Sequence, residues 1–175
     1  MKSLVLGGVK SGKSRFAEQC AREWAEQPGN RDRDVIYLAT AESMDDEFSQ
    51  RIAQHRRQRP AAWQTVEESL EITAVIEQAS GMNQCLLVEC LTLWLTRLLE
   101  DEGQLDSRID AFCDAVGRYQ GEIILVSNET GLGIMPANAL ARRFGDEAGI
   151  LHQRLAGVCD RVVLTVAGLP HFLKQ

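Results

Sequence analysis

An eight-residue segment near the amino terminus, residues 7–14, has the composition and spacing of a phosphate-binding loop. Its members are Gly7, Gly8, Val9, Lys10, Ser11, Gly12, Lys13 and Ser14, which fit the pattern G-x-x-x-x-G-K-[ST]. Glycines let backbone N–H groups curl around phosphate oxygens, and a following helix adds the partial positive charge of its N-terminus. Lys13 would then reach the β- and γ-phosphates of a nucleotide, and the Ser14 hydroxyl would bind Mg²⁺. A chance glycine turn is the alternative, but the context of the motif, between an apolar run and a helix-period segment, favours the nucleotide site.

A carboxylate that could share this metal ends a later apolar run. Glu89 closes the run Cys85-Leu86-Leu87-Val88, and a metal-binding acid is expected at the end of a strand that neighbours the phosphate loop. Aspartate is commoner at such positions. Glu89 could instead only cap the helix that follows, but a carboxylate at the carboxyl edge of the sheet favours a metal or nucleotide role.

One histidine lies on a predicted helix among basic residues. The segment 45–58 starts with acidic residues and ends with basic ones, which complements the helix dipole and could by itself explain the charges. Phe48, Ile52 and His55 are spaced i, i+4 and i+7, which places His55 on the apolar stripe. A neutral imidazole is a good nucleophile towards phosphorus, and nearby arginines disfavour its protonation and could hold phosphates. A histidine on such a face is more often a satisfied core residue, and these residues alone leave both interpretations open.

A polar turn, residues 127–136, follows the fourth apolar run. It contains Asn128, Glu129, two glycines and a proline, and it is predicted at the sheet edge where open α/β sheets bind ligands. A substrate loop and an ordinary strand-to-helix connection both fit this pattern. The next helix carries polar residues that are either surface groups or a ligand-facing row: Asn138, Arg142, Arg143 and Asp146.

Five short apolar runs and six helix-period segments would position these side chains. The runs cover residues 3–6, 35–39, 85–89, 123–127 and 161–166, and the helical segments cover 13–26, 45–58, 70–79, 91–100, 106–118 and 137–157. Continuously apolar runs indicate strands that are covered on both faces. The alternation of strands and helices predicts an α/β fold, a mostly parallel sheet with helices on both faces. Residues 63–67 could add a short strand or form an extended linker. Without repeats or a flexible linker in the sequence, one catalytic domain over residues 1–175 is predicted.

The composition narrows the class of function. The 175 residues include 19 basic and 25 acidic side chains, a net charge of −6, with 45% hydrophobic residues, which is typical of a globular protein. Net acidity argues against sequence-independent nucleic-acid binding. The first apolar run is too short for a secretory signal, and the longest apolar stretch falls short of the roughly 20 residues that span a bilayer. Five cysteines without a C-x-x-C pair fit free thiols in the cytoplasm. The sequence therefore predicts a cytoplasmic protein with a small-molecule substrate.

Several motifs occur together and in order along residues 1–174. They are Gly7-Gly8-x-x-Ser11-Gly12-Lys13-Ser14-Arg15, Tyr37-Leu38-Ala39-Thr40, Asp45-Asp46-Glu47, Arg51-Ile52, His55-Arg56, Arg59-Pro60 with Trp63, Glu89-Cys90-Leu91-Thr92 and Asn128-Glu129-x-Gly131-x-Gly133-Ile134-x-Pro136. Together they resemble the bifunctional adenosylcobinamide kinase/adenosylcobinamide-phosphate guanylyltransferase family of cobalamin biosynthesis. The resemblance implies a P-loop NTPase fold of the RecA-like type and assembly as a trimer.

The resemblance also implies two reactions. A nucleoside triphosphate, ATP or GTP, phosphorylates the aminopropanol hydroxyl of adenosylcobinamide. GTP then guanylylates a histidine of the enzyme, and the GMP passes to the new phosphate, giving adenosylcobinamide-GDP and pyrophosphate. The histidine that matches the family motif is His55, rather than His152 in the last helix or His171 in the tail. The alternatives are a single-function small-molecule kinase, in which His55 is structural, and a nucleotide-sensing protein without turnover.

Nucleotide contacts implied by the resemblance fall on the phosphate loop and on three further segments. Beyond Gly7 to Ser14 they are Thr40, Ala41, Glu42, Arg56, Arg57, Gln58, Arg59, Glu67 and Glu89. Mg²⁺ is the implied metal, held by Ser14 and Glu89. The sequence departs from many relatives at His152, where they carry Asn.

Overall fold

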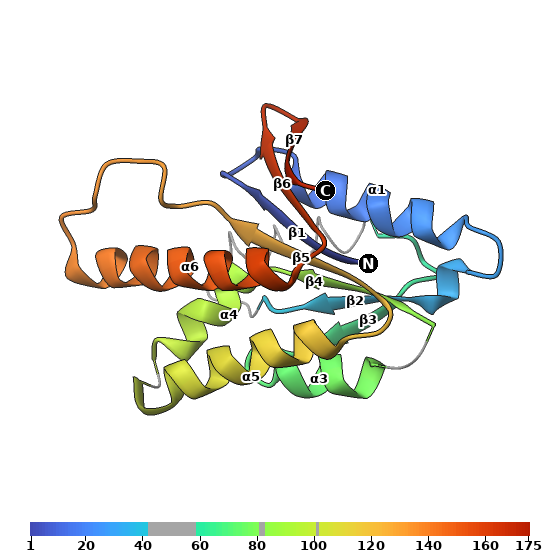
Figure 1. Ribbon diagram of the computed structural model, residues 1–175, viewed down its shortest axis with the longest axis horizontal. Helices are drawn as coiled ribbons and strands as arrows, with labels where there is room; N and C mark the ends of the chain where they lie inside the picture. Colours follow the sequence, from blue (N-terminus) through green and yellow to red (C-terminus); the bar gives the residue numbers. More distant parts are fainter. Residues whose placement is uncertain (42–58, 81–82, 101) are drawn as a thin grey trace.

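The computed structural model describes residues 1–41, 59–80, 83–100 and 102–175, and the described strands form one sheet (Figure 1). The strands are β1 (Lys2–Gly7), β2 (Val35–Ala39), β3 (Gln64–Glu67), β4 (Cys85–Glu89), β5 (Glu122–Asn128), β6 (Arg161–Val166) and β7 (Leu169–Lys174). Their order is β3-β2-β4-β5-β1-β6-β7, and all neighbours are parallel except β6 and β7. The predicted mostly parallel sheet is confirmed.

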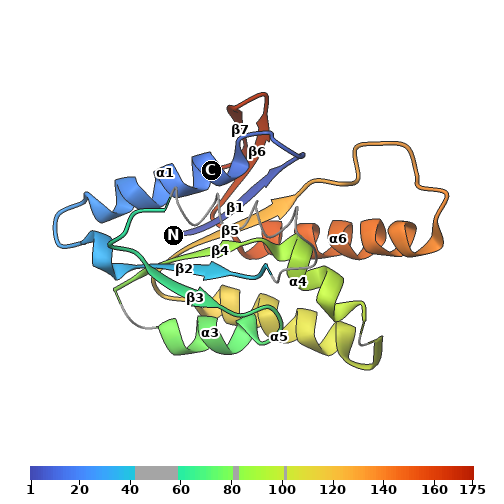
Figure 2. The ribbon, with the colours of Figure 1, turned by 180° about the vertical axis from the view of Figure 1, so that it is seen from behind.

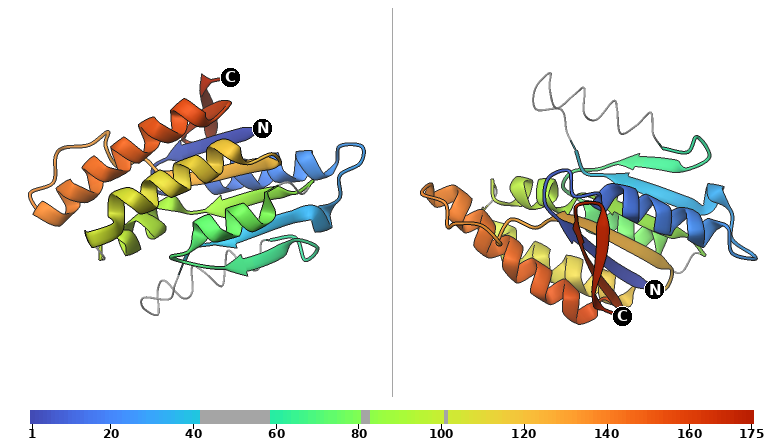
Figure 3. Two further views of the ribbon diagram at one scale, coloured as in Figure 1. Left: turned by 60° about the horizontal axis from the view of Figure 1, so that its bottom comes forward. Right: turned by 90° about the horizontal axis from the view of Figure 1, so that it is seen from above.

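Helices cover both faces of this sheet (Figure 3). On one face lies α1 (Lys13–Ala25); Figure 2 shows the molecule from the side opposite to that of Figure 1. The other face carries α3 (Ile72–Ala79), α4 (Leu91–Leu98), α5 (Leu105–Arg118) and α6 (Ala139–Val158). Two short 3₁₀ turns, η1 (Asp32–Asp34) and η2 (Glu102–Gln104), complete the described elements. The helix expected over residues 45–58 lies outside the described residues. In the part of the chain that the structure covers, no helix is long and apolar enough to cross a membrane.

The continuous apolar runs are explained by two cores. Successive strand residues point to opposite faces, so Leu4 and Leu38 enter the larger core with α3 to α6. Their neighbours Val5 and Tyr37 enter the smaller core beneath α1, with Trp24. Because both faces of the central strands are buried, polar residues appear only near the strand ends, where a ligand site can form.

The carboxyl-terminal hairpin was not expected from the sequence. β7 pairs antiparallel with β6 at the sheet edge and is exposed along its whole length. Its turn uses Ala167 and Gly168, which have φ values of 52° and 82°, the geometry that hairpins usually obtain from Asn-Gly or Asp-Gly. This strand was not predicted for two reasons. It contains Pro170, which is compatible only with an edge strand, and its residues do not alternate between apolar and polar. The open question at residues 63–67 is settled, because Gln64–Glu67 pairs with β2 as a strand.

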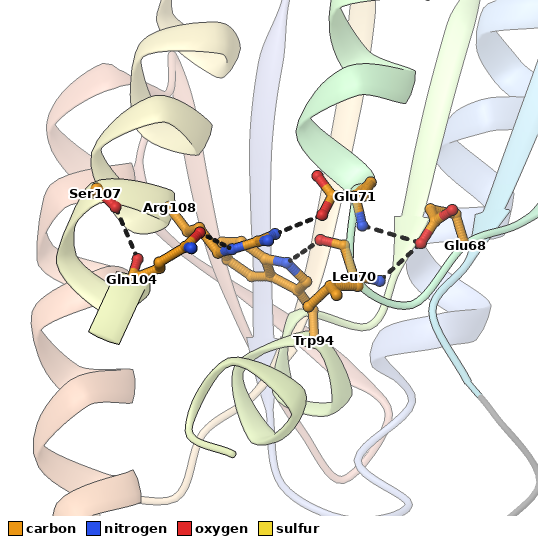
Figure 4. A network of polar contacts seen from close by, with 7 residues as sticks. All are labelled: Glu68, Leu70, Glu71, Trp94, Gln104, Ser107 and Arg108. Carbon is orange, nitrogen blue, oxygen red and sulfur yellow. Dashed lines mark hydrogen bonds and ion pairs between the residues drawn. The ribbon is translucent and has the colours of Figure 1, made fainter. Parts of the chain in front are cut away.

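A polar network ties the starts of α3, α4 and α5 together on the face of the sheet opposite α1 (Figure 4). The Glu68 carboxylate accepts the backbone N–H groups of Leu70 and Glu71, both at 2.9 Å, and these bonds lower the pKa of Glu68. The Trp94 indole donates to the Leu70 carbonyl at 3.1 Å, and Arg108 pairs with Glu71 at 2.8 Å. The network therefore fixes the chain that leads from β3 into α3, on the side of the sheet away from α1.

The β6–β7 hairpin packs directly against the phosphate-loop segment. The Ser11 carbonyl accepts the Gly168 N–H at 2.8 Å, and the Ser11 and Thr165 hydroxyls lie 2.8 Å apart. Gly12 has a φ of 97°, and a Cβ there would lie 3.0 Å from the Gly168 Cα. Glycine at position 12 is thus required both by its backbone conformation and by this close approach.

Replacing Gly7 by alanine should lower the free energy of unfolding by about 2–3 kcal/mol, the cost of overpacking. An added Cβ would lie 2.3 Å from the hydroxyl oxygens of Ser11 and Thr165 and 2.8 Å from the Thr165 carbonyl. Gly8→Ala is the matched control, because no described atom lies within 4 Å of a Cβ at that position. Urea denaturation of both variants checks the prediction, and equal losses of stability would contradict it.

Candidate nucleotide site

The carboxyl ends of four adjacent strands meet at one edge of the sheet. The register pairs Ala39 of β2 with Glu89 of β4, and Gly7 of β1 with Asn128 of β5. The phosphate loop leaves β1 at this edge and leads into α1. Parallel sheets with this arrangement bind ligands beyond the carboxyl ends of their strands, so the sequence motifs converge where a ligand is expected.

The phosphate loop presents backbone donors to this edge. Lys10 and Gly12 adopt positive φ values of 55° and 97°, so the loop curls back on itself, and Ser11 N–H donates to the Gly8 carbonyl at 3.2 Å. Among the described residues, no side chain caps the start of α1. Its first N–H groups are therefore available to an anion. The Lys13 ammonium lies 3.3 Å from the Gly8 carbonyl oxygen, folded over the loop that a triphosphate would occupy.

Glu89 is held between α1 and β2. The Ser14 hydroxyl donates to Glu89 Oε1, and the Tyr37 hydroxyl donates to Glu89 Oε2 at 3.2 Å. The two residues that the sequence suggests for Mg²⁺ are therefore in direct contact. A hydroxyl and a carboxylate fit this ion, because Mg²⁺ prefers oxygen ligands and is often held by one or two carboxylates together with substrate phosphates. The described residues contain no cluster of three or more His, Cys, Asp or Glu side chains that could hold a metal alone.

Two further charged side chains, Glu18 and Arg59, lie in the region of Glu89. One turn after Ser14 on α1, burial raises the pKa of Glu18, and the negative charge of Glu89 raises it further. Arg59 stacks over the Tyr37 ring, with its guanidinium carbon 3.6 Å from the ring centre. Two guanidinium nitrogens of Arg59, Nε and Nη1, are buried and have no hydrogen-bond partner among the described residues. Buried donors of this kind require an acceptor, and an anion at the site would supply one.

Thr40 fixes the backbone directly after Glu89. Its hydroxyl accepts the Cys90 N–H at 2.7 Å and donates to the Cys90 carbonyl at 2.8 Å. The Thr40 N–H also donates to the Glu89 carbonyl at 3.0 Å. Thr40 is buried, with 1% of its surface exposed. Both hydrogen bonds of its hydroxyl therefore go to the backbone next to Glu89.

Replacing Thr40 by valine should lower the free energy of unfolding by about 1–3 kcal/mol, because the isosteric methyl leaves the N–H and C=O of Cys90 without their partner. Thr40→Ser keeps the hydroxyl and should lose clearly less stability. Chemical denaturation of the two variants side by side is the measurement. A serine variant as unstable as the valine variant would mean that packing, rather than the hydrogen bonds, fixes this position.

Of the other residues that the sequence suggests for the site, the structure describes only some. Glu67 ends β3, the outermost strand on that side of the sheet, and Ala41 lies two residues beyond β2. The remaining ones lie outside the described residues: Glu42, His55, Arg56, Arg57 and Gln58. Tyr37 and Glu18 were missed as individual site residues. The one signal for Tyr37 was a polar-tipped aromatic within an otherwise aliphatic strand.

The turn after β5 joins the phosphate loop directly. The Glu129 N–H donates to the Gly7 carbonyl at 3.1 Å, and the Asn128 N–H donates to the Thr92 hydroxyl at 2.9 Å. Two of the polar residues that the sequence singles out on the next helix make hydrogen bonds that stabilise the fold. Asn138 caps α6 by accepting the Ala141 N–H, and Arg142 donates to the backbone carbonyls of residues 136 and 137. The turn is therefore anchored at both ends.

Comparisons with known proteins agree with one another. The family model described as "CobU: Cobinamide kinase / cobinamide phosphate guanyltransferase" matches residues 3–173. The chain is 50% identical to the bifunctional adenosylcobalamin biosynthesis protein CobP of Pseudomonas aeruginosa, over 99% of this chain and 98% of that protein. It is 35% identical to the protein CobU of Escherichia coli, which has the same descriptive name, over 97% of each. Among solved structures, a KaiC-like protein of Pyrococcus horikoshii aligns with a TM-score of 0.54 and 17% identity, over 93% of this chain and 70% of that one. This last likeness concerns the fold alone.

Proposed function

The chain belongs to the cobinamide kinase/cobinamide phosphate guanyltransferase family, and from that premise we propose that a single nucleotide site at its sheet edge serves both reactions. The family's two activities are a phosphoryl transfer to cobinamide and a guanylyl transfer to the resulting phosphate, both within adenosylcobalamin biosynthesis. We propose further that residues 1–175 form one catalytic domain in which the two reactions share the phosphate loop.

The observation that supports this proposal most directly is the contact of Ser14 with Glu89 at a helix start that no described side chain caps. Gly7 to Ser14 would hold the β- and γ-phosphates of ATP or GTP, with Lys13 as the catalytic cation. Mg²⁺, held by Ser14 and Glu89, would neutralise charge on the transferring phosphates. Arg59, with its unpartnered buried nitrogens, would bind an anionic part of the nucleotide.

For the second reaction, we propose His55 as the nucleophile. A neutral imidazole nitrogen would attack the α-phosphorus of GTP, and the bond to the bridging oxygen would break with release of pyrophosphate. The GMP would then move from His55 to the phosphate of adenosylcobinamide phosphate. Binding roles for Thr40, Ala41, Glu42, Arg56, Arg57, Gln58 and Glu67 and assembly as a trimer follow from the resemblance of the motifs and remain proposals. A cytoplasmic location, which the cysteine pattern and the short apolar runs suggest, is likewise a proposal.

Both activities can be tested on the purified chain. With adenosylcobinamide, γ-³²P-labelled ATP or GTP should transfer label to the corrinoid. With α-³²P-labelled GTP alone, the protein should acquire an acid-labile GMP adduct. Corrinoid labelling without the adduct would indicate a single-function kinase. Nucleotide binding without either transfer would indicate a sensor, and the proposal would fail.

A further inference from the structure

A buried polar chain runs from α6 to the carboxylate beside the phosphate loop. His152 on α6 is 8% exposed, and its Nε2 lies 2.8 Å from the hydroxyl oxygen of Ser127, which ends the buried part of β5 at 2% exposed. Its Nδ1 lies 3.9 Å from Glu129 Oε2. The three side chains therefore form a row, Ser127–His152–Glu129, whose last member borders the loop.

The tautomer of His152 follows from its surroundings. Burial lowers the pKa of His152, and the charge of Glu129 opposes this only in part, so the ring is neutral at neutral pH with one N–H group. If that N–H were on Nε2, the bare Nδ1 lone pair would face a carboxylate. The favourable arrangement has the Ser127 hydroxyl donating to Nε2 and the Nδ1–H pointing at Glu129. The row thus orients a donor towards one oxygen of the Glu129 carboxylate.

Two hydrogen bonds hold Glu129, and the Nδ1 of His152 lies 3.9 Å from its other carboxylate oxygen, beyond hydrogen-bond distance. The Glu129 N–H donates to the Gly7 carbonyl, Oε1 accepts the Gly131 N–H at 2.5 Å, and Oε2 faces His152. β5 is the direct neighbour of β1, whereas Glu89 lies one strand further away and is already engaged by Ser14 and Tyr37. Among the described residues, Glu129 is thus a carboxylate next to the start of the phosphate loop that the proposed metal site leaves unused. Its side chain is 20% exposed, so water can reach it.

We propose that Glu129 is the general base of the phosphoryl-transfer step and that His152, anchored by Ser127, is its positioning residue. This inference rests on the proposed kinase reaction. The acceptor hydroxyl gives its proton to the Glu129 carboxylate as its oxygen forms the new bond to the γ-phosphorus. The bond between that phosphorus and the β,γ-bridging oxygen breaks, and the nucleoside diphosphate leaves with the electron pair. Glu129 then returns the proton to solvent.

The test exploits the second reaction, in which histidine is the nucleophile and no hydroxyl is deprotonated. Glu129→Gln keeps an acceptor for the Gly131 N–H and should lower kcat for corrinoid phosphorylation by about 10²–10⁴-fold, the usual contribution of a general base. Formation of the GMP adduct from GTP should stay near the wild-type rate. Unchanged phosphorylation, or an equal loss of both reactions, would overturn the role of Glu129. A wild-type protein that does not phosphorylate the corrinoid would instead refute the proposed function.

The positioning role has its own pair of variants. His152→Asn keeps a side-chain donor and should retain most of the kinase kcat, whereas His152→Leu should lose about tenfold or more in kcat through misplacement of the carboxylate, with the nucleotide KM unchanged. Equal kcat values in the two variants would refute positioning. If His152→Leu does not fold, Ser127→Ala removes the anchor while leaving His152 in place, and it should show the same loss of kcat with unchanged KM. A Ser127→Ala variant with wild-type kcat would then refute the role.

Discussion

His55→Ala should abolish guanylylation of the enzyme, with a loss of at least about 10³-fold, because removing a covalent nucleophile leaves no group to carry the GMP. Corrinoid phosphorylation should persist near the wild-type rate. The loop, Ser14 and Glu89, which the kinase step would use, are held by contacts among α1, β2 and β4. Labelling with α-³²P-GTP and with γ-³²P-ATP on the same preparation measures the two reactions separately.

The matched control for this variant is His171→Ala. His171 lies on the exposed edge strand β7, which β6 separates from β1, and no contact of the proposed nucleotide site uses it. It should retain both activities. Two results would contradict the role of His55: an adduct that forms equally well in His55→Ala, or an adduct lost also in His171→Ala. Loss of both reactions in His55→Ala alone would show instead that the histidine supports the nucleotide site as a whole.

The sequence was sufficient for the parts of the site that local pattern determines. A glycine-rich turn between a buried strand and a helix has few possible geometries, so the placement of Gly12 and Lys13 followed from spacing. Glu89 followed from its place at the end of an apolar run, because carboxyl ends of parallel strands share one edge. The structure confirms that Glu89 meets Ser14. Their role in binding metal remains a prediction.

Contacts between distant elements could not be predicted in this way. His152 reaches Ser127 across 25 residues only because α6 packs on this face of the sheet, and periodicity alone cannot give the rotation and height of a packed helix. Arg59 over Tyr37 depends in the same way on how the chain returns to β3. The hairpin against Ser11 was missed because an exposed edge strand needs no hydrophobic pattern. In each case the missing information was the packing of one element on another.

Lys13→Ala should impair both reactions. The ammonium would neutralise charge on the β- and γ-phosphates, and loss of one preorganised electrostatic contact typically costs about 10²–10³-fold in kcat. In the kinase step the charge develops on the leaving diphosphate. In guanylylation it develops on pyrophosphate, which the same loop would hold. Adduct formation and corrinoid phosphorylation should therefore fall together, unlike in His55→Ala.

The fold should survive the loss of Lys13. Its ammonium has one described hydrogen bond, 3.3 Å long and exposed, to the Gly8 carbonyl, and exposed side chains of this kind usually change stability by about 0.5 kcal/mol or less. Arg118→Ala removes a comparable exposed cation at the end of α5, just before β5 begins and so at the opposite edge of the sheet, and should leave both activities intact. A Lys13→Ala protein that melts normally, loses phosphorylation and still forms the GMP adduct would mean that GTP binds differently in the two reactions. That result would refute the single shared site, because a shared loop requires one cation to serve both leaving groups.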